Sequence, residues 1–244
     1  MKAVSARNDN LAYPASLRTH WDEQAPECLF LLGNTELLRG DSLALFCSIK
    51  CPAGVILKTY DLARALRDAG VPIVGGFHTP MRRECLALLL RGAQPIVVCP
   101  ARGLEGSQPP PDVQDEIKAG RVLLVSMFGS WYRRATAELA DQRNHLVVIP
   151  AGMALMSHAA PARKTEALCR EIMAMGKPLF TMHAPENANL LALGAKPLVV
   201  EALSVLLPGT STTKLRGLLG EVRGPRWYRL TSGSSGRCCA PPLN

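Results

Sequence analysis

Several marks of common protein classes are missing from this sequence of 244 residues. It contains no run of eighteen apolar residues, which argues against a membrane-spanning helix. Its first 27 residues lack the apolar centre of a secretion signal. We therefore expect a cytoplasmic protein with no membrane partner.

The motifs that hold common cofactors and metals are also missing. Neither G-x-G-x-x-G nor G-x-x-x-x-G-K-[ST] occurs, so dinucleotide oxidoreductases and P-loop proteins lose their main support. The eight cysteines do not provide the close ligand pairs of a zinc site, and reduced thiols are expected. No serine elbow, H-E-x-x-H or paired carboxylates stand at the expected cleft. We predict no cofactor, no metal and no catalytic activity.

Charge is unbalanced, whereas the apolar content is ordinary. Hydrophobic residues make up 48% of the chain, enough for a globular core, and aromatic residues only 5%. Lysine and arginine outnumber the acids by 28 to 20, and six of these cations follow residue 209. Such a basic tail can contact the phosphates of a nucleic acid or can be a solvated extension, and both readings stay open.

Short apolar runs alternate with amphipathic segments between residues 28 and 200. Continuous apolar runs are typical of strands buried on both faces, and glycines mark the ends of the amphipathic segments. This alternation predicts an α/β fold, a Rossmann-like open and mostly parallel sheet with helices on both faces. The predicted strands are 29–32, 43–47, 72–74, 95–99, 122–125, 146–149, 178–181 and 198–200, and the predicted helices are 55–69, 80–91, 111–119, 132–142, 161–175 and 186–193. The predicted division is an N-terminal extension (1–27), the Rossmann-like domain (28–207) and a flexible basic tail (208–244).

Ligands of such sheets bind beyond the carboxyl ends of the strands. Small-residue turns follow three predicted strands, and each turn leads toward a helix whose backbone N–H groups favour an anion. Thr79 is the expected N-cap of the second of these helices, with Pro80 at its first position. Arg82 and Arg83 are expected on a solvated helix face. The predicted anion site consists of Ser48, Lys50, Gly75, Gly76, His78, Arg133, Arg134 and Gly152.

Several segments occur in the order of motifs in the bacterial DNA-processing protein A family. Leu29-Phe-Leu-Leu-Gly-Asn34-Thr-Glu-Leu-Leu38 resembles its LF-x-x-GN-x-x-LL lead-in, and Ser48-Ile-Lys50 stands at its Gly-Ser-Arg turn. The remaining matches are Val74-Gly-Gly76-Phe-His for Ser-Gly-Leu-Ala-Arg-Gly, Trp131-Tyr-Arg133-Arg134 for Phe-Pro-Arg-Arg-Asn-Arg, Ile149-Pro-Ala-Gly152 for Val-Glu-Ala-Gly, and Asn187-Ala-Asn189-Leu-Leu-Ala-Leu-Gly194-Ala195 for Asn-x-Leu-Ile-x-x-Gly-Ala.

This resemblance implies a Rossmann-like domain that binds single-stranded DNA in a basic pocket during transformation and recombination. It adds Asn189 to the nucleic-acid-binding residues, and it implies a recombinase partner and a homodimer as further expectations. Two alternatives use the same edge of the sheet. One is a sensor of a small nucleotide, and the other is a phosphoribohydrolase of the lysine-decarboxylase-like family. The signature of that family, Pro-Gly-Gly-x-Gly-Thr-x-x-Glu, is matched here by Gly152 but has no glutamate.

Overall fold

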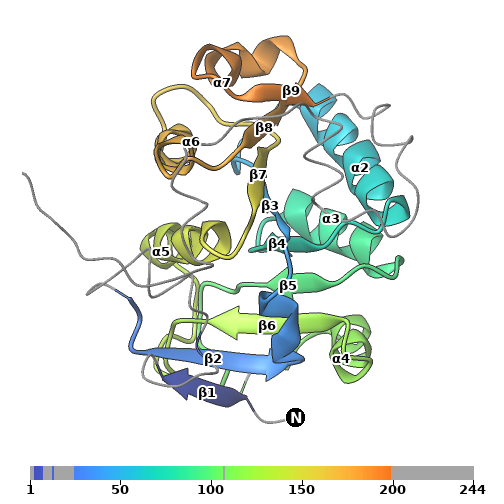
Figure 1. The fold of residues 1–244 in the computed structure, drawn as a ribbon, viewed down its shortest axis with the longest axis vertical. Coiled ribbons are helices and arrows are strands. Elements are labelled where there is room, and N and C mark those ends of the chain that lie inside the picture. Colours follow the sequence, from blue (N-terminus) through green and yellow to red (C-terminus); the bar gives the residue numbers. More distant parts are fainter. Residues whose placement is uncertain (1–2, 8–12, 14–24, 107, 199–244) are drawn as a thin grey trace, which may run out of the picture.

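The computed structural model describes residues 3–7, 13, 25–106 and 108–198. Its strands form one nine-stranded sheet in the order β1-β2-β6-β5-β4-β3-β7-β8-β9 (Figure 1). The strands are β1 (Val4–Arg7), β2 (Cys28–Gly33), β3 (Leu43–Phe46), β4 (Ile73–Gly75), β5 (Ile96–Val98), β6 (Val122–Ser126), β7 (Met153–Met156), β8 (Leu179–Met182) and β9 (Lys196–Leu198). Strands β3 to β9 are parallel to one another, whereas β2 pairs antiparallel with both β6 and β1 at one edge.

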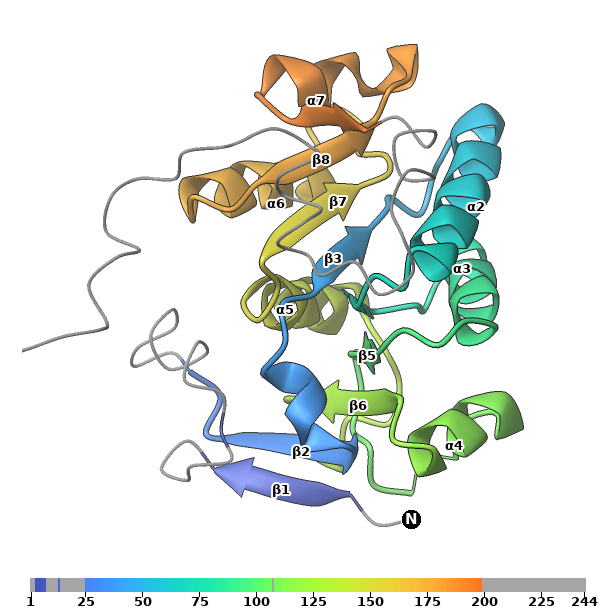
Figure 2. The same cartoon turned by 45° about the vertical axis from the view of Figure 1, so that its right-hand side comes forward.

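Helices cover both faces of the sheet. They are α2 (Ala53–Asp68), α3 (Pro80–Leu90), α4 (Pro111–Lys118), α5 (Ala137–Val148), α6 (Lys164–Ala174) and α7 (Ala188–Ala192), with 3-10 helices η2 (Thr35–Leu38) and η3 (Pro185–Asn187). Figures 1 and 2 show α2, α3 and α4 on one face and α5 and α6 on the other. The predicted Rossmann-like fold class is therefore confirmed.

Alternation along the strands divides the apolar interior into two cores. Leu43 and Leu45 of β3 join the core under α2, α3 and α4, whereas Ala44 and Phe46 join the core under α5 and α6. Successive side chains of a strand point to opposite faces, so a strand covered on both faces is apolar at every position. All four residues of β3 are accordingly buried.

The prediction of a strand at residues 146–149 is wrong. These residues form the buried C-terminal end of α5 and the residue that follows it, and the strand is β7, a few residues later. A four-residue apolar run does not distinguish a buried strand from the buried end of a helix. The ammonium of Lys177 fixes this helix end by donating hydrogen bonds to three backbone carbonyls, those of Val148, Ile149 and Ala151.

The N-terminal segment contributes to the sheet. Within the predicted N-terminal extension, Val4–Arg7 pairs with β2, and Ala6 is buried there. Tyr13 is also buried, and its hydroxyl donates to the carbonyl of Pro26 at 2.9 Å. The division at residues 27 and 207 stays a prediction, and the basic tail lies outside the described residues.

The described residues also bear on the expectations for membrane spans and cysteines. None of their helices is both long and apolar enough to cross a membrane. All six cysteines in the described part of the chain are free thiols, as predicted from their sequence context.

Candidate nucleic-acid interface

The order of strands creates a switch point between β3 and β7. The chain runs from β3 through β4 and β5 to β6 on one side, and then returns to place β7, β8 and β9 on the other side. Connections diverge at such a point, and the carboxyl ends of the two strands form a crevice for ligands. In this chain two backbone hydrogen bonds continue the pairing of β3 and β7 past the strand ends, from Ser157 N to Phe46 O and from Ser48 N to His158 O, both 2.9 Å long.

Most of the predicted site residues lie at this carboxyl edge. Ser48 and Lys50 are in the loop after β3, with Ser48 buried and Lys50 exposed. Gly75 is the last residue of β4, and Gly76 and His78 follow it. Arg133 and Arg134 are exposed in the loop after β6. Because three strand spacings of about 4.8 Å separate β3 from β6, about 14 Å of sheet edge lies between the two loops.

Gly152 does not belong to this group. It stands immediately before β7, and its N–H donates to the carbonyl of Ser42, which precedes β3. Both residues therefore lie at the amino edge of the parallel strands. The prediction that the turn containing Gly152 shares an edge with Lys50 and His78 is wrong, because it depended on the misassigned strand at 146–149.

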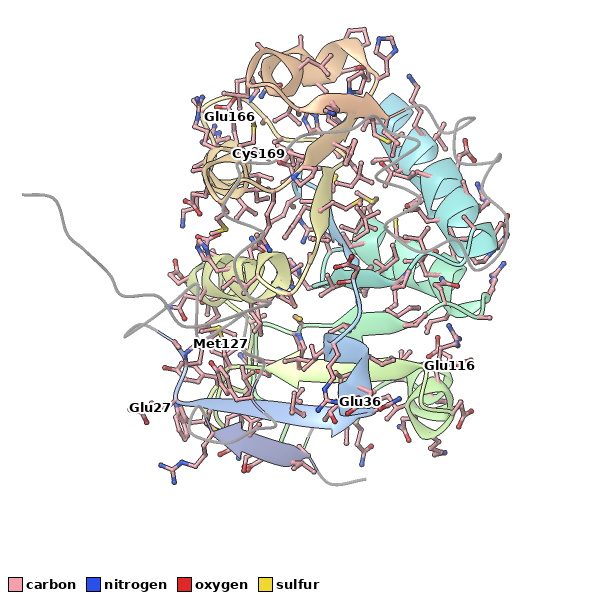
Figure 3. The ribbon with its side chains drawn as sticks, in the orientation of Figure 1. Glu27, Glu36, Glu116, Met127, Glu166 and Cys169 are labelled. Carbon is pink, nitrogen blue, oxygen red and sulfur yellow. The ribbon has the colours of Figure 1, made fainter. Side chains whose placement is uncertain are left out.

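Asn189 supports the switch point from α7. Its amide nitrogen donates to the carbonyl of Ala159 at 3.0 Å and to Oε1 of Glu166 at 2.8 Å. The other carboxylate oxygen of Glu166 accepts from the N–H of Ala162, whose φ is +56°. These hydrogen bonds, that from Asn189 first, lower the pKa of Glu166. Glu166 extends from α6, as Figure 3 shows, and Asn189 and Glu166 together fix the loop after β7.

The loop at residues 127–136 after β6 exposes aromatic side chains beside its arginines. Trp131 is 75% exposed and Tyr132 40% exposed, with their ring centroids 5.8 Å apart. Phe128 anchors the loop in the interior, and its ring centroid is 5.6 Å from that of Tyr132. The hydroxyl of Ser126 accepts from Phe128 N and donates to the carbonyl of Arg102. The loop is therefore ordered while its two outer rings remain available.

Thr136 explains why the helix predicted at 132–142 starts later, at Ala137. Its hydroxyl accepts from the N–H of Leu139 and caps α5. Residues 131–136 are therefore free to form the exposed part of the loop. Figure 3 shows Met127, at the start of this loop, and Glu27 at one end of strands β2 and β6, and Glu36 and Glu116 toward the other end.

Two arginines at this edge are buried, which the sequence did not predict. Arg143 of α5 is 0% exposed, and its guanidinium donates to the carbonyl of Cys99 at 2.9 Å and to Nδ1 of His78 at 3.1 Å. Arg82 of α3 is 7% exposed and donates to the carbonyl of Cys47, so the prediction of a solvated face is wrong for this residue. Among the ion pairs of the described residues, none includes either arginine.

The surroundings of His78 fix both the protonation state and the tautomer of its imidazole. Burial first, and then the charges of Arg143, Arg82 and Arg83, lower the pKa of His78 to about 4. The imidazole is therefore neutral at pH 7. Because a guanidinium can only donate, Nδ1 must accept, and the ring proton resides on Nε2. His78 thus offers an N–H donor at the carboxyl end of β4.

Gly76 makes room for the buried guanidinium. A Cβ built at this position would lie 1.3 Å from Nη1 of Arg143, so any side chain at residue 76 would displace the arginine. The sequence indicates only in part that Gly76 packs against Arg143. Consecutive glycines predict a close approach of the backbone to some group, but they do not identify the group.

These features define a class of protein: a Rossmann-like fold whose switch-point edge presents cations and exposed aromatic rings. Comparison with solved structures narrows the class. DNA processing protein A of Streptococcus pneumoniae superposes with a TM-score of 0.68 at 19% identity, over 81% of this chain and 71% of that one. The protein of the same name from Helicobacter pylori superposes with a TM-score of 0.66 at 20% identity, over 89% and 97%.

The chain thus has the fold of DNA processing protein A, which confirms at the level of fold the resemblance seen in the sequence. The Helicobacter pylori structure is described as having a unique mode of binding single-stranded DNA. No family model matches the chain, and no curated protein matches it.

Proposed function

We propose that the chain binds single-stranded DNA across the carboxyl edge of its sheet, as a non-enzymatic DNA-processing protein. The observation that carries the proposal is the loop after β6, where exposed Trp131 and Tyr132 precede exposed Arg133 and Arg134. Proteins that bind single strands combine aromatic rings, on which bases stack, with cations that contact phosphates. The loop after β3, three strands away along the same edge, adds Lys50 and an exposed Ile49.

The geometry favours a single strand over a duplex. A base can stack on Trp131 or Tyr132 only if its face is open, which base pairing and stacking within a duplex prevent. The preference for a single strand also agrees with the fold, which the chain shares with the Helicobacter pylori protein described as binding single-stranded DNA. Roles in DNA uptake and recombination, a recombinase partner and a homodimer belong to the proposal as its finer parts.

Binding of labelled oligo-thymidine of increasing length, measured by fluorescence anisotropy at two salt concentrations, tests the proposal. Affinity should rise with length and fall steeply with salt. Trp131→Ala should weaken binding by about 1–3 kcal/mol, the usual contribution of one stacked base. Its thermal stability should stay close to that of the native chain because the ring is mostly exposed.

A double variant with a matched control separates local interactions from net charge. Arg133→Ala with Arg134→Ala should flatten the salt slope by about 0.7 for each phosphate that the arginines neutralise in the native complex. Arg39→Ala with Arg91→Ala removes the same charge at the amino edge and should leave the slope nearly unchanged. Equal effects of the two double variants would reject the interface. Length-independent binding of free nucleotides would instead support the sensor of a small nucleotide.

A further inference from the structure

Arg82 and Arg143 form an unusual pair, because both guanidinium groups are buried and neither faces a carboxylate. Nε and Nη1 of Arg82 have no hydrogen-bond partner, and its Nη2 donates to the carbonyl of Cys47. Burial, first, and then the charge of Arg82 lower the pKa of Arg143 to about 10. The carboxylate that acts most on Arg143, that of Asp141, is already paired with Lys164. Two positive charges therefore share the interior without a counter-charge.

Such an arrangement is costly in a protein that has no ligand. A buried charge without a counter-charge loses its hydration and recovers only what its hydrogen bonds supply, and native structures satisfy nearly all buried donors. The pair also lies at the ligand edge of the sheet, where Cys47 follows β3, His78 follows β4 and Cys99 follows β5. The unused donors therefore point to an anion.

We propose that Arg82, Arg143 and His78 form a subsite for one terminal phosphate monoester, the charged end of a single strand or of a nucleotide. The inference rests on the proposed function for its choice of a nucleic-acid phosphate. A monoester carries close to two negative charges at pH 7 and can offset both guanidinium groups, whereas an internal phosphodiester carries one.

The surroundings of the pair supply the remaining donors. His78 presents Nε2–H, because its Nδ1 accepts from Arg143. Arg82 lies in the first turn of α3, which is capped by Thr79 and directs the positive end of its dipole to the same edge. His78 is the one member of the subsite that is only partly buried.

Oligo-thymidine with a 5′-phosphate, a 3′-phosphate or two hydroxyl ends tests the inference on the full chain. The native protein should bind one phosphorylated form at least about tenfold more tightly than the hydroxyl form, the equivalent of one charge-assisted hydrogen bond. In Arg82→Met that preference should disappear. The control Arg83→Met removes one positive charge from an exposed neighbour on α3, and this variant should retain the preference for phosphorylated ends.

Thermal unfolding without ligand gives a second readout that a purely structural arginine would not produce. Arg82→Met removes an uncompensated buried charge and keeps most of the side-chain volume, so the melting temperature of the free protein should rise or stay the same. Inorganic phosphate should raise the melting temperature of the native protein more than that of Arg82→Met. A lower melting temperature together with an intact preference for phosphorylated ends would overturn the inference.

The two proposals can fail separately. If the native protein binds hydroxyl-ended and phosphorylated strands equally, the subsite is wrong and the DNA interface stands. If thymidine monophosphate and inorganic phosphate stabilise the protein while no oligonucleotide binds, the subsite stands and the DNA interface is wrong.

Discussion

Gly76→Ala should destabilise the protein because the buried guanidinium of Arg143 occupies the space that the new Cβ would need. The new Cβ would lie 1.3 Å from Nη1, 2.0 Å from Cζ and 2.6 Å from Nη2 of Arg143, which excludes the present position of the guanidinium. Moving it breaks the hydrogen bonds to the carbonyl of Cys99 and to Nδ1 of His78. Hydrogen bonds to charged groups contribute about 1.5–3 kcal/mol each, so the free energy of unfolding should fall by about 3–6 kcal/mol.

Urea unfolding monitored by circular dichroism measures this loss, and Gly54→Ala is the matched control. Gly54 lies in the first turn of α2, and a Cβ there meets no atom within 4 Å. The same chemical change should therefore raise stability by up to about 0.5–1 kcal/mol, because alanine favours the helix. A Gly76→Ala protein within about 1 kcal/mol of the native chain would refute the placement of Arg143 beneath this turn.

Two other substitutions test the electrostatics of the fold. The fold lowers the pKa of His78 from 6.5 to about 4, so protonation of its imidazole favours the unfolded chain. The free energy of unfolding should therefore fall as the pH drops from about 6.5 to 4. Allowing for the partial exposure of the ring, the loss should be about 2 kcal/mol. His78→Gln should show a flatter pH profile in urea unfolding, and an unchanged profile would contradict the neutral imidazole. Lys177→Met removes three hydrogen bonds to the end of α5; because this ammonium is only partly buried and all three bonds share one donor group, the loss in thermal unfolding should be about 2–4 kcal/mol, less than three separate charged hydrogen bonds would give. Lys118→Met, which loses one exposed ion pair with Asp115, should cost less than about 1 kcal/mol, and equal losses would reject the difference.

Local sequence signals were sufficient for most of the architecture. Short apolar runs and glycine stops located the parallel strands β3, β4, β5, β6 and β8, because a strand covered on both faces is apolar throughout, whereas the strand predicted at 198–200 shares only Leu198 with β9. Thr79 and Pro80 marked the start of α3 correctly, since the threonine hydroxyl caps the helix with no help from distant residues. The carboxyl-edge positions of Lys50 and His78 followed directly from that order of elements.

Interactions between distant segments decided the rest. Residues 146–149 lie at a helix end whose carbonyls accept hydrogen bonds from Lys177, far along the chain, and Gly152 therefore lies at the amino edge and not at the predicted carboxyl edge. The burial of Arg82 and Arg143 depends on carbonyls 35 and 44 residues away in the sequence. Sequence spacing reports which face of a helix is apolar, but it does not report which strand end lies against a given charge. The tertiary structure alone therefore brought the two unpaired arginines together.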